Sequence, residues 1–137
     1  VCISEATIKL LKLGVDKEET KKIVENLIKQ KYIDEKRYAF AYVNDHYKLK
    51  KWGRNKIKNS LKLKGITSQN INLSLKDINQ TIYFNNLQET LIQKLKNIQQ
   101  KENCSIREKK GKLYNYLVSR GYEPSLVLKE MTLIKNI

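Results

Sequence analysis

The sequence has little glycine and almost no proline: five glycines and one proline in 137 residues. A β-sandwich, a collagen-like chain or a flexible linker would need many more of these residues, so these classes are excluded. No apolar run approaches the roughly 18 residues that span a bilayer, and no segment resembles a signal peptide. We therefore expect a cytoplasmic protein built from long helices, without a membrane segment.

Residues that often carry chemistry are also few. His46 is the only histidine, and Cys2 and Cys104 lie far apart, so neither a zinc site nor a Cys/His nucleophile pair can be assembled. The sequence has no P-loop, dinucleotide-binding fingerprint or paired-carboxylate motif. We expect no enzymatic activity, no cofactor and no metal. Val1 is not an initiator methionine, as expected of a fragment that lacks an N-terminal piece.

Acidic residues are scarce relative to basic ones. Twenty-eight Lys and Arg stand against fourteen Asp and Glu, which gives a formal net charge of +14. AT-rich coding sequence would raise the lysine content, but it would raise glutamate equally, so the positive sign remains to be explained. A charge of this size favours polyanionic partners, chiefly nucleic acid.

A repeat organises the chain, and three glycines mark it. Gly14, Gly65 and Gly121 lie 51 and 56 residues apart, and each follows apolar residues four and eight positions earlier. That spacing is one face of a helix, and glycine can adopt the left-handed cap that ends it. Capping residues are expected to begin helices at Ser4, Asp16, Asp34, Thr67, Ser105 and Glu123-Pro124.

The predicted fold is all-α, with tandem three-helix units that stack into an elongated, curved array. The units are expected at residues 1–50, 51–104 and 105–137, the last with two helices visible. Long third helices are expected over 34–50 and 79–101. In the second of these, an apolar stripe is expected to form core; it consists of Phe84, Leu87, Leu91, Leu95 and Ile98. A single globular bundle is the alternative, which the repeat disfavours.

The most informative segment runs from His46 to Lys76 and contains nine Lys and Arg but no Asp or Glu. Arg54, Lys58 and Lys62 recur at spacing four, which places them on one side of a helix, where they could reach phosphates. We predict a weakly sequence-specific nucleic-acid or filament-binding surface. Its residues are Lys48, Lys50, Lys51, Trp52, Arg54, Lys56, Lys58, Lys62 and Lys64. An ordinary solvated lysine-rich face is the alternative.

Aromatic residues precede and enter this segment. The set that could stack on single-stranded bases is Tyr38, Phe40, Tyr42, Tyr47 and Trp52. Tyr38 and Tyr42 share a helix face at spacing four, so core is the preferred interpretation for both. For Trp52, beside a glycine in a basic loop, stacking or partner contact and simple packing stay equally open.

Three segments occur in a specific order along nearly the whole chain. They are YIDEKRYAFAYV at 32–43; WGRNKIK at 52–58 with Leu61 and Lys64-Gly65-Ile66; and KLY at 112–114 with Leu117 and SRGY at 119–122. The first resembles the IDE-x-R-[FY]-A-x-A-[YF]-V segment of the RecX recombination regulators, and the others resemble that family's basic helix and third-unit signature. Gly111 departs from the pattern, because alanine is expected in that helix and glycine costs roughly 1 kcal/mol.

The resemblance implies an all-helical array of three-helix units that binds filaments of the recombinase RecA. Proteins of this kind lodge in the filament groove, inhibit RecA activities and also touch DNA, and they have no enzymatic activity. The expected partners are the RecA filament and single- and double-stranded DNA, and we expect a monomer. The alternative is a free-standing, sequence-nonspecific architectural DNA-binding protein that uses the same lysines. Charge cannot separate the two hypotheses, because both require it.

Overall fold

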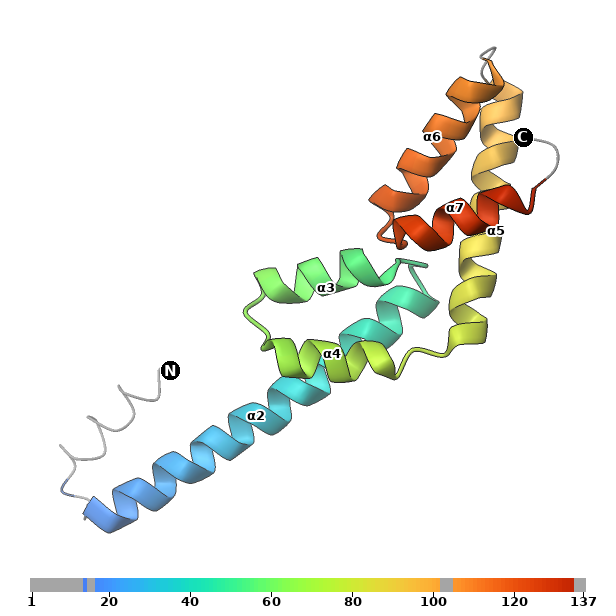
Figure 1. The fold of residues 1–137 in the computed structure, drawn as a ribbon. Coiled ribbons are helices and arrows are strands. Elements are labelled where there is room, and N and C mark those ends of the chain that lie inside the picture. The colour runs from blue at the N-terminus through green and yellow to red at the C-terminus, as the bar shows by residue number, and fades with distance from the viewer. Residues whose placement is uncertain (1–13, 15–16, 102–104, 135–137) are drawn as a thin grey trace. The chain divides into compact units, whose positions relative to one another are not determined.

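The computed structural model describes residues 14, 17–101 and 105–134. Within these residues the chain forms six α-helices and no strand (Figure 1). The helices are α2 (Lys17–Lys48), α3 (Arg54–Leu63), α4 (Ser68–Lys76), α5 (Gln80–Lys101), α6 (Ile106–Ser119) and α7 (Pro124–Thr132). The prediction of an all-α fold is confirmed. The helix expected to begin at Ser4 lies outside the described residues, as do Asp16, Cys2 and Cys104.

The chain divides into two compact units, Val1–Tyr38 and Ala39–Ile137. In the first, the structure describes Gly14 and the N-terminal part of α2, on which Thr20 is buried and Ile28 is exposed. The second contains the rest of α2 and the helices α3 to α7. The three predicted unit boundaries and the predicted curved shape stay predictions.

The α2 helix corrects one expectation. Asp34 was expected to begin a separate helix, but α2 continues through it from Lys17 to Lys48. The segment contains no glycine or proline to interrupt it. The Asp34 carboxylate accepts a 3.0 Å hydrogen bond from Nε2 of Gln30, four residues earlier, so it acts on the helix surface and not as an N-cap.

Two glycine turns repeat the same local arrangement. Gly65 follows the C-cap of α3 and Gly121 follows the C-cap of α6, with φ of 81° and 99°, and a nine-residue helix comes after each turn. The predicted caps are confirmed: the Thr67 and Ser105 hydroxyls accept hydrogen bonds from the amides of Asn70 and Glu108, and Pro124 begins α7. Gly14 also has a positive φ, of 79°.

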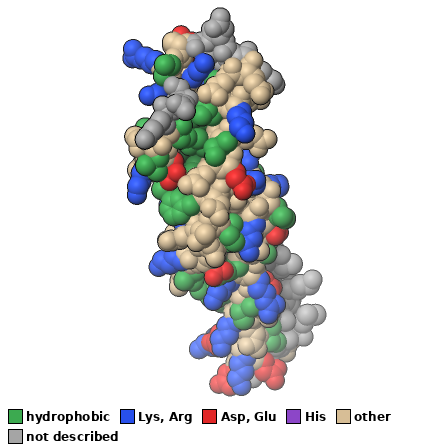
Figure 2. All heavy atoms as spheres, turned by 90° about the vertical axis from the view of Figure 1, so that its right-hand side faces the viewer, with side chains coloured by type: hydrophobic (Ala, Val, Ile, Leu, Met, Phe, Trp, Pro, Cys, Tyr) green, Lys and Arg blue, Asp and Glu red, His purple; other side chains and the backbone are tan. Residues whose placement is uncertain are grey.

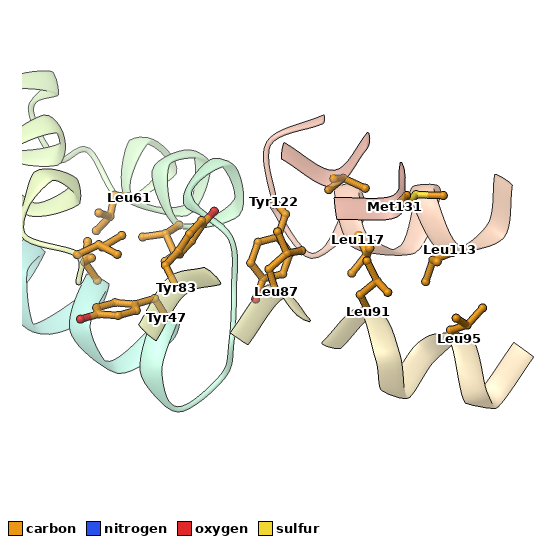
Figure 3. Packing of buried hydrophobic residues seen from close by; sticks show 14 of the residues in the cluster. Tyr47, Leu61, Tyr83, Leu87, Leu91, Leu95, Leu113, Leu117, Tyr122 and Met131 are labelled. Atoms are coloured by element: carbon orange, nitrogen blue, oxygen red, sulfur yellow. The ribbon is translucent and has the colours of Figure 1, made fainter. Parts of the chain in front are cut away.

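A hydrophobic core runs through the second unit (Figure 3). On α5 the buried stripe begins at Tyr83, one residue before the expected Phe84, and continues as predicted through Leu87, Leu91, Leu95 and Ile98. Opposite it lie buried side chains of α6 and α7, namely Leu113, Leu117, Val127 and Met131. Phe84 is only half-buried, because the adjacent tyrosine takes the inward position.

The buried face of α2 also differs from the expected one. Ala39, Val43 and Tyr47, at spacing four, are at most 4% exposed. This phase turns Tyr38 outward, and it is 44% exposed, so the prediction that Tyr38 is core is wrong. Tyr42 is half-buried at the edge of the same face.

Backbone hydrogen bonds join the α2–α3 connection to the turn between α6 and α7. The Gly53 amide donates to the Arg120 carbonyl at 2.8 Å, and the Asn55 amide donates to the Gly121 carbonyl at 2.9 Å. The Tyr122 hydroxyl donates to the Lys51 carbonyl at 2.6 Å. These bonds fix the start of α3 and thereby position the basic segment.

Candidate polyanion-binding surface

The predicted binding residues occupy the end of α2, the connection after it and α3. Lys48 is the last residue of α2, and Lys50, Lys51 and Trp52 lie in the connection. The other five follow on α3 or at its C-terminus: Arg54, Lys56, Lys58, Lys62 and Lys64. All nine therefore belong to one continuous stretch of the second unit.

Arg54 is engaged inside the protein. Its guanidinium Nη1 lies 2.8 Å from Oε2 of Glu123, and its Cζ lies 4.0 Å from the centroid of the Tyr83 ring. Its amide donates a 2.9 Å bond to the Tyr83 hydroxyl, which in turn donates to Oε1 of Glu123. Burial, reinforced by the hydrogen bond to Glu123, raises the pKa of Tyr83 far above the usual phenol value. This network links α3, α5 and the N-cap of α7.

Lys51 is also paired. Its Nζ lies 2.8 Å from Oε2 of Glu89 on α5, and the two side chains are 40% and 62% exposed. Its backbone has a φ of 55°, the only positive value at a non-glycine residue among those described. An ion pair this exposed contributes little to stability, so the ammonium can exchange its partner at low cost.

The lysines of α3 present their charge without acidic partners. Lys56, Lys58, Lys62 and Lys64, here called the α3 lysines, form no ion pair with any residue that the structure describes. Ile57 and Leu61 are buried and hold the orientation of the helix. The α3 lysines can therefore approach phosphates without first breaking an ion pair.

A row of aromatic rings lies beside these lysines. The Tyr42 and His46 rings stack with centroids 3.8 Å apart, and the Trp52 ring follows at 4.6 Å from His46. The Tyr42 hydroxyl is hydrogen-bonded to Ser60 Oγ on α3. The row therefore ties the end of α2 to α3.

Lysines cover this aromatic row. Nζ of Lys56 and of Lys50 lie 4.3 and 5.5 Å from the Trp52 ring centroid, and Nζ of Lys64 lies 5.8 Å from that of Tyr42. These are cation–π distances, so the rings keep the ammonium groups gathered at the surface.

Trp52 borders an open hollow of about 360 Å³. Its other polar walls include Asn55, Asn59 and Ser60, and Lys56 supplies a cation. An aromatic ring, two amides and an ammonium are the groups that stack on a base, hydrogen-bond its edge and contact its phosphate. Trp52 is half-buried, so it both packs on His46 and lines the hollow.

Two basic residues beyond the predicted set contribute to this part of the molecule. Arg120 donates from Nη2 to the Lys50 carbonyl, and Lys94 projects beside Tyr116, with Nζ 4.7 Å from the ring centroid. Both are separated by many residues from the acid-free segment, and although Arg120 lies in the SRGY motif, no local pattern relates either residue to that segment. Tertiary contacts between distant segments bring both residues near Lys51.

On the face drawn in Figure 2, Lys and Arg side chains are dispersed among other groups. Among the described residues, no three His, Cys, Asp or Glu side chains cluster in a way that could hold a metal ion. Nor is any helix in that part of the chain long and apolar enough to cross a membrane.

Comparison with known proteins places this geometry in context. Residues 34–75 match the family model described as RecX, second three-helix domain. The chain is 33% identical over 132 residues to the regulatory protein RecX of Clostridium acetobutylicum, which covers 93% of this chain and 60% of that protein. It is 34% identical over 118 residues to that of Clostridium tetani, covering 83% of this chain and 51% of that protein.

Solved structures give the same result for the fold. A crystal structure of regulatory protein RecX superposes with a TM-score of 0.67 at 21% identity, over 96% of this chain and 63% of that one. RecX from Lactobacillus salivarius superposes with a TM-score of 0.63 at 23% identity, over 96% and 86% of the two chains. The chain spans between 48% and 60% of the length of the curated relatives it matches.

Proposed function

The chain belongs to the RecX family of regulatory proteins, and from this premise we propose that it binds RecA recombinase filaments and inhibits their ATPase and strand-exchange activities. Through this inhibition the protein modulates recombination and DNA repair, and it needs no catalytic activity of its own. We place it in the cytoplasm, acting as a monomer. The chain spans about half the length of the curated relatives it matches, so the activity of the whole protein is a proposal.

The observation that carries this proposal is the set of unpaired lysines on α3 beside the aromatic row. A nucleoprotein filament combines phosphates with protein walls, and a surface of ammonium groups without acidic partners next to a half-buried indole ring suits both. We propose that the contact residues are Lys48, Lys50, Trp52 and the α3 lysines. Arg54 supports them by fixing the start of α3 through Glu123.

Inhibition of a preformed filament tests the proposal. RecA from the same organism is first assembled on single-stranded DNA, at a concentration that saturates the DNA. DNA-dependent ATP hydrolysis is then followed as the protein is added. We expect ATP hydrolysis and strand exchange to fall, and the protein alone to hydrolyse no nucleotide. The variant Lys56→Gln/Lys58→Gln/Lys62→Gln should inhibit less, because electrostatic attraction speeds encounter and helps to hold the complex.

A matched variant controls for net charge. Lys96, Lys110 and Lys129 are exposed on α5, α6 and α7, outside the proposed surface. Their triple replacement by Gln removes the same charge, and we expect it to inhibit as the unmodified protein does. Equal loss of inhibition in both variants would assign the effect to overall charge and not to this surface.

The same acid-free surface also suits a sequence-nonspecific architectural DNA-binding protein, which is the second candidate function. In that case the protein would bind naked DNA and filaments with the same salt dependence. It would then reduce ATP hydrolysis only by competing for DNA.

A further inference from the structure

A second polar hollow, of about 330 Å³, lies apart from the one beside Trp52. Three cationic side chains line it, from three different segments: Lys51 before α3, Lys94 on α5 and Arg120 after α6. Hydroxyl and amide groups of Thr90, Gln93 and Asn97 complete the polar wall, and no acidic side chain lines it. Convergent cations with neutral hydrogen-bonding groups are the chemistry that recognises a phosphate group.

The Arg120 guanidinium has five N–H donors, more than its hydrogen bond to the Lys50 carbonyl uses. Its Nη2 donates to the Lys50 carbonyl, while its Nε is buried and has no hydrogen-bond partner among the described residues. A ligand in the hollow cannot reach this buried Nε, so the guanidinium would meet a ligand through its other N–H groups. Since arginine binds phosphate through two parallel N–H groups, its guanidinium is suited to supply such bonds.

The two lysines complete the cationic wall. Lys94 has no acidic partner in the part of the chain that the structure describes, and its Nζ lies 4.7 Å from the centroid of the Tyr116 ring. Lys51 pairs with Glu89, but that carboxylate is 62% exposed and does not line the hollow. An incoming anion can therefore recruit the Lys51 ammonium at little cost.

Internal hydrogen bonds hold the backbone around Lys51 in the absence of a ligand. Its φ of 55° is a left-handed conformation that costs a lysine energy. Hydrogen bonds from Tyr122 to the Lys51 carbonyl and from Arg120 to the Lys50 carbonyl maintain it. The wall of the hollow is thus built by contacts between distant segments and does not need to form when a ligand binds.

We propose that this hollow is a phosphate-binding site, in which Lys51, Lys94 and Arg120 hold a phosphate group. The phosphate belongs either to a nucleic-acid backbone or to a free phosphate ion; both present the same anionic oxygens. The inference does not depend on the filament-regulator role, because it rests only on the residues of the hollow.

Nuclear magnetic resonance titration of the whole chain tests the site. Amide resonances of Lys94, Arg120 and Asn97 are followed while inorganic phosphate, and separately a short oligothymidylate, is added. We expect these resonances to shift saturably. Shifts with both probes identify free phosphate as a ligand, and shifts with the oligonucleotide alone identify the nucleic-acid backbone. No saturable shift with either probe overturns the proposal.

Variants assign the shifts to the hollow. Lys94→Gln should weaken the affinity about tenfold, the loss expected for one charge-assisted contact. Lys96→Gln, two residues along α5 and exposed, should leave it unchanged. If the two variants weaken binding equally, the site is wrong. Lys51→Gln repeats the test with a residue of a different segment, and circular dichroism checks that each variant remains folded.

Discussion

Gly53 and Gly121 lie with their backbones in direct contact, although 68 positions separate them in the sequence. A Cβ atom on Gly53 would lie 2.1 Å from the carbonyl carbon of Gly121, and one on Gly121 would lie 2.4 Å from Cβ of Lys56. Neither contact is possible for a larger residue without movement of the main chain. The start of α3, and with it the basic surface, therefore depends on two glycines.

Gly53→Ala and Gly121→Ala should each destabilise the protein by several kcal/mol, because backbone cannot yield as a side chain can. Gly121 also has a φ of 99°, which alanine resists. Gly111 is the matched control: it lies inside α6 with nothing within 4 Å of an added Cβ. Gly111→Ala should therefore stabilise by about 1 kcal/mol. Thermal unfolding followed by circular dichroism measures all three, and destabilisation by Gly111→Ala equal to that of Gly53→Ala would contradict the contact.

The Arg54–Glu123 pair should contribute more to stability than the Lys51–Glu89 pair. The side chains of the first are 26% and 30% exposed and those of the second 40% and 62%. Breaking the first leaves Glu123 without its cation, so Arg54→Gln should cost about 2 kcal/mol, between the values for exposed and buried pairs. Lys51→Gln should cost less than about 1 kcal/mol. Urea unfolding compares them, and equal losses would contradict a structural role for Arg54.

Stability should fall at alkaline pH. An unfolded tyrosine titrates near pH 10, whereas burial raises the pKa of both Tyr83 and Tyr122 in the folded protein. The unfolded state therefore loses these protons first. The stabilisation is fully present below about pH 10 and decreases above it, by about 1.4 kcal/mol per pH unit for each retained proton.

Urea unfolding between about pH 8 and about pH 11 gives this slope. Tyr83→Phe should lower stability at every pH, since it loses the hydrogen bonds to Glu123 and Arg54. The stability of this variant should nevertheless decline less steeply above about pH 10 than that of the unmodified protein. Parallel curves would mean that Tyr83 ionises equally in both states.

Binding to duplex DNA should depend steeply on salt and weakly on sequence. If Lys56, Lys58 and Lys62 each contact one phosphate, replacing all three by Gln makes the log–log salt slope shallower by about 0.9 × 3, or roughly 2.7. The Lys96, Lys110 and Lys129 control variant should keep the original slope. Fluorescence anisotropy over a salt series measures both. An unchanged slope in the α3 variant would mean that these lysines form only a solvated face.

The sequence predicts those features of the fold that depend on local chemistry. Gly65 and Gly121 end helices because only glycine adopts their positive φ readily, and Thr67 and Ser105 cap helices through their own hydroxyls. The partners of Tyr83 are different. Leu87, Leu91 and Leu95 recur every four residues, and the same step places Tyr83 on the buried face, but a helical period does not reveal that its hydroxyl reaches Glu123 and Arg54.

The candidate surface also combines features that the sequence predicts with features that it does not. A run of lysines without acids is visible in the sequence, and its members on α3 have no acidic partner among the described residues. The role of Arg54 is not visible, because its partner lies 69 positions later. The second hollow likewise joins Lys51, Lys94 and Arg120 only through tertiary contacts.

Salt separates binding to the filament from binding to DNA, and it tests the central claim most directly. The protein is added to preformed RecA filaments at a salt concentration at which its binding to naked DNA has vanished and the filaments alone still hydrolyse ATP. Protein contacts are less sensitive to salt than phosphate contacts, so a filament regulator should still reduce ATP hydrolysis there. If inhibition disappears at the same salt concentration as binding to naked DNA, the protein acts on DNA alone and the regulator account is contradicted.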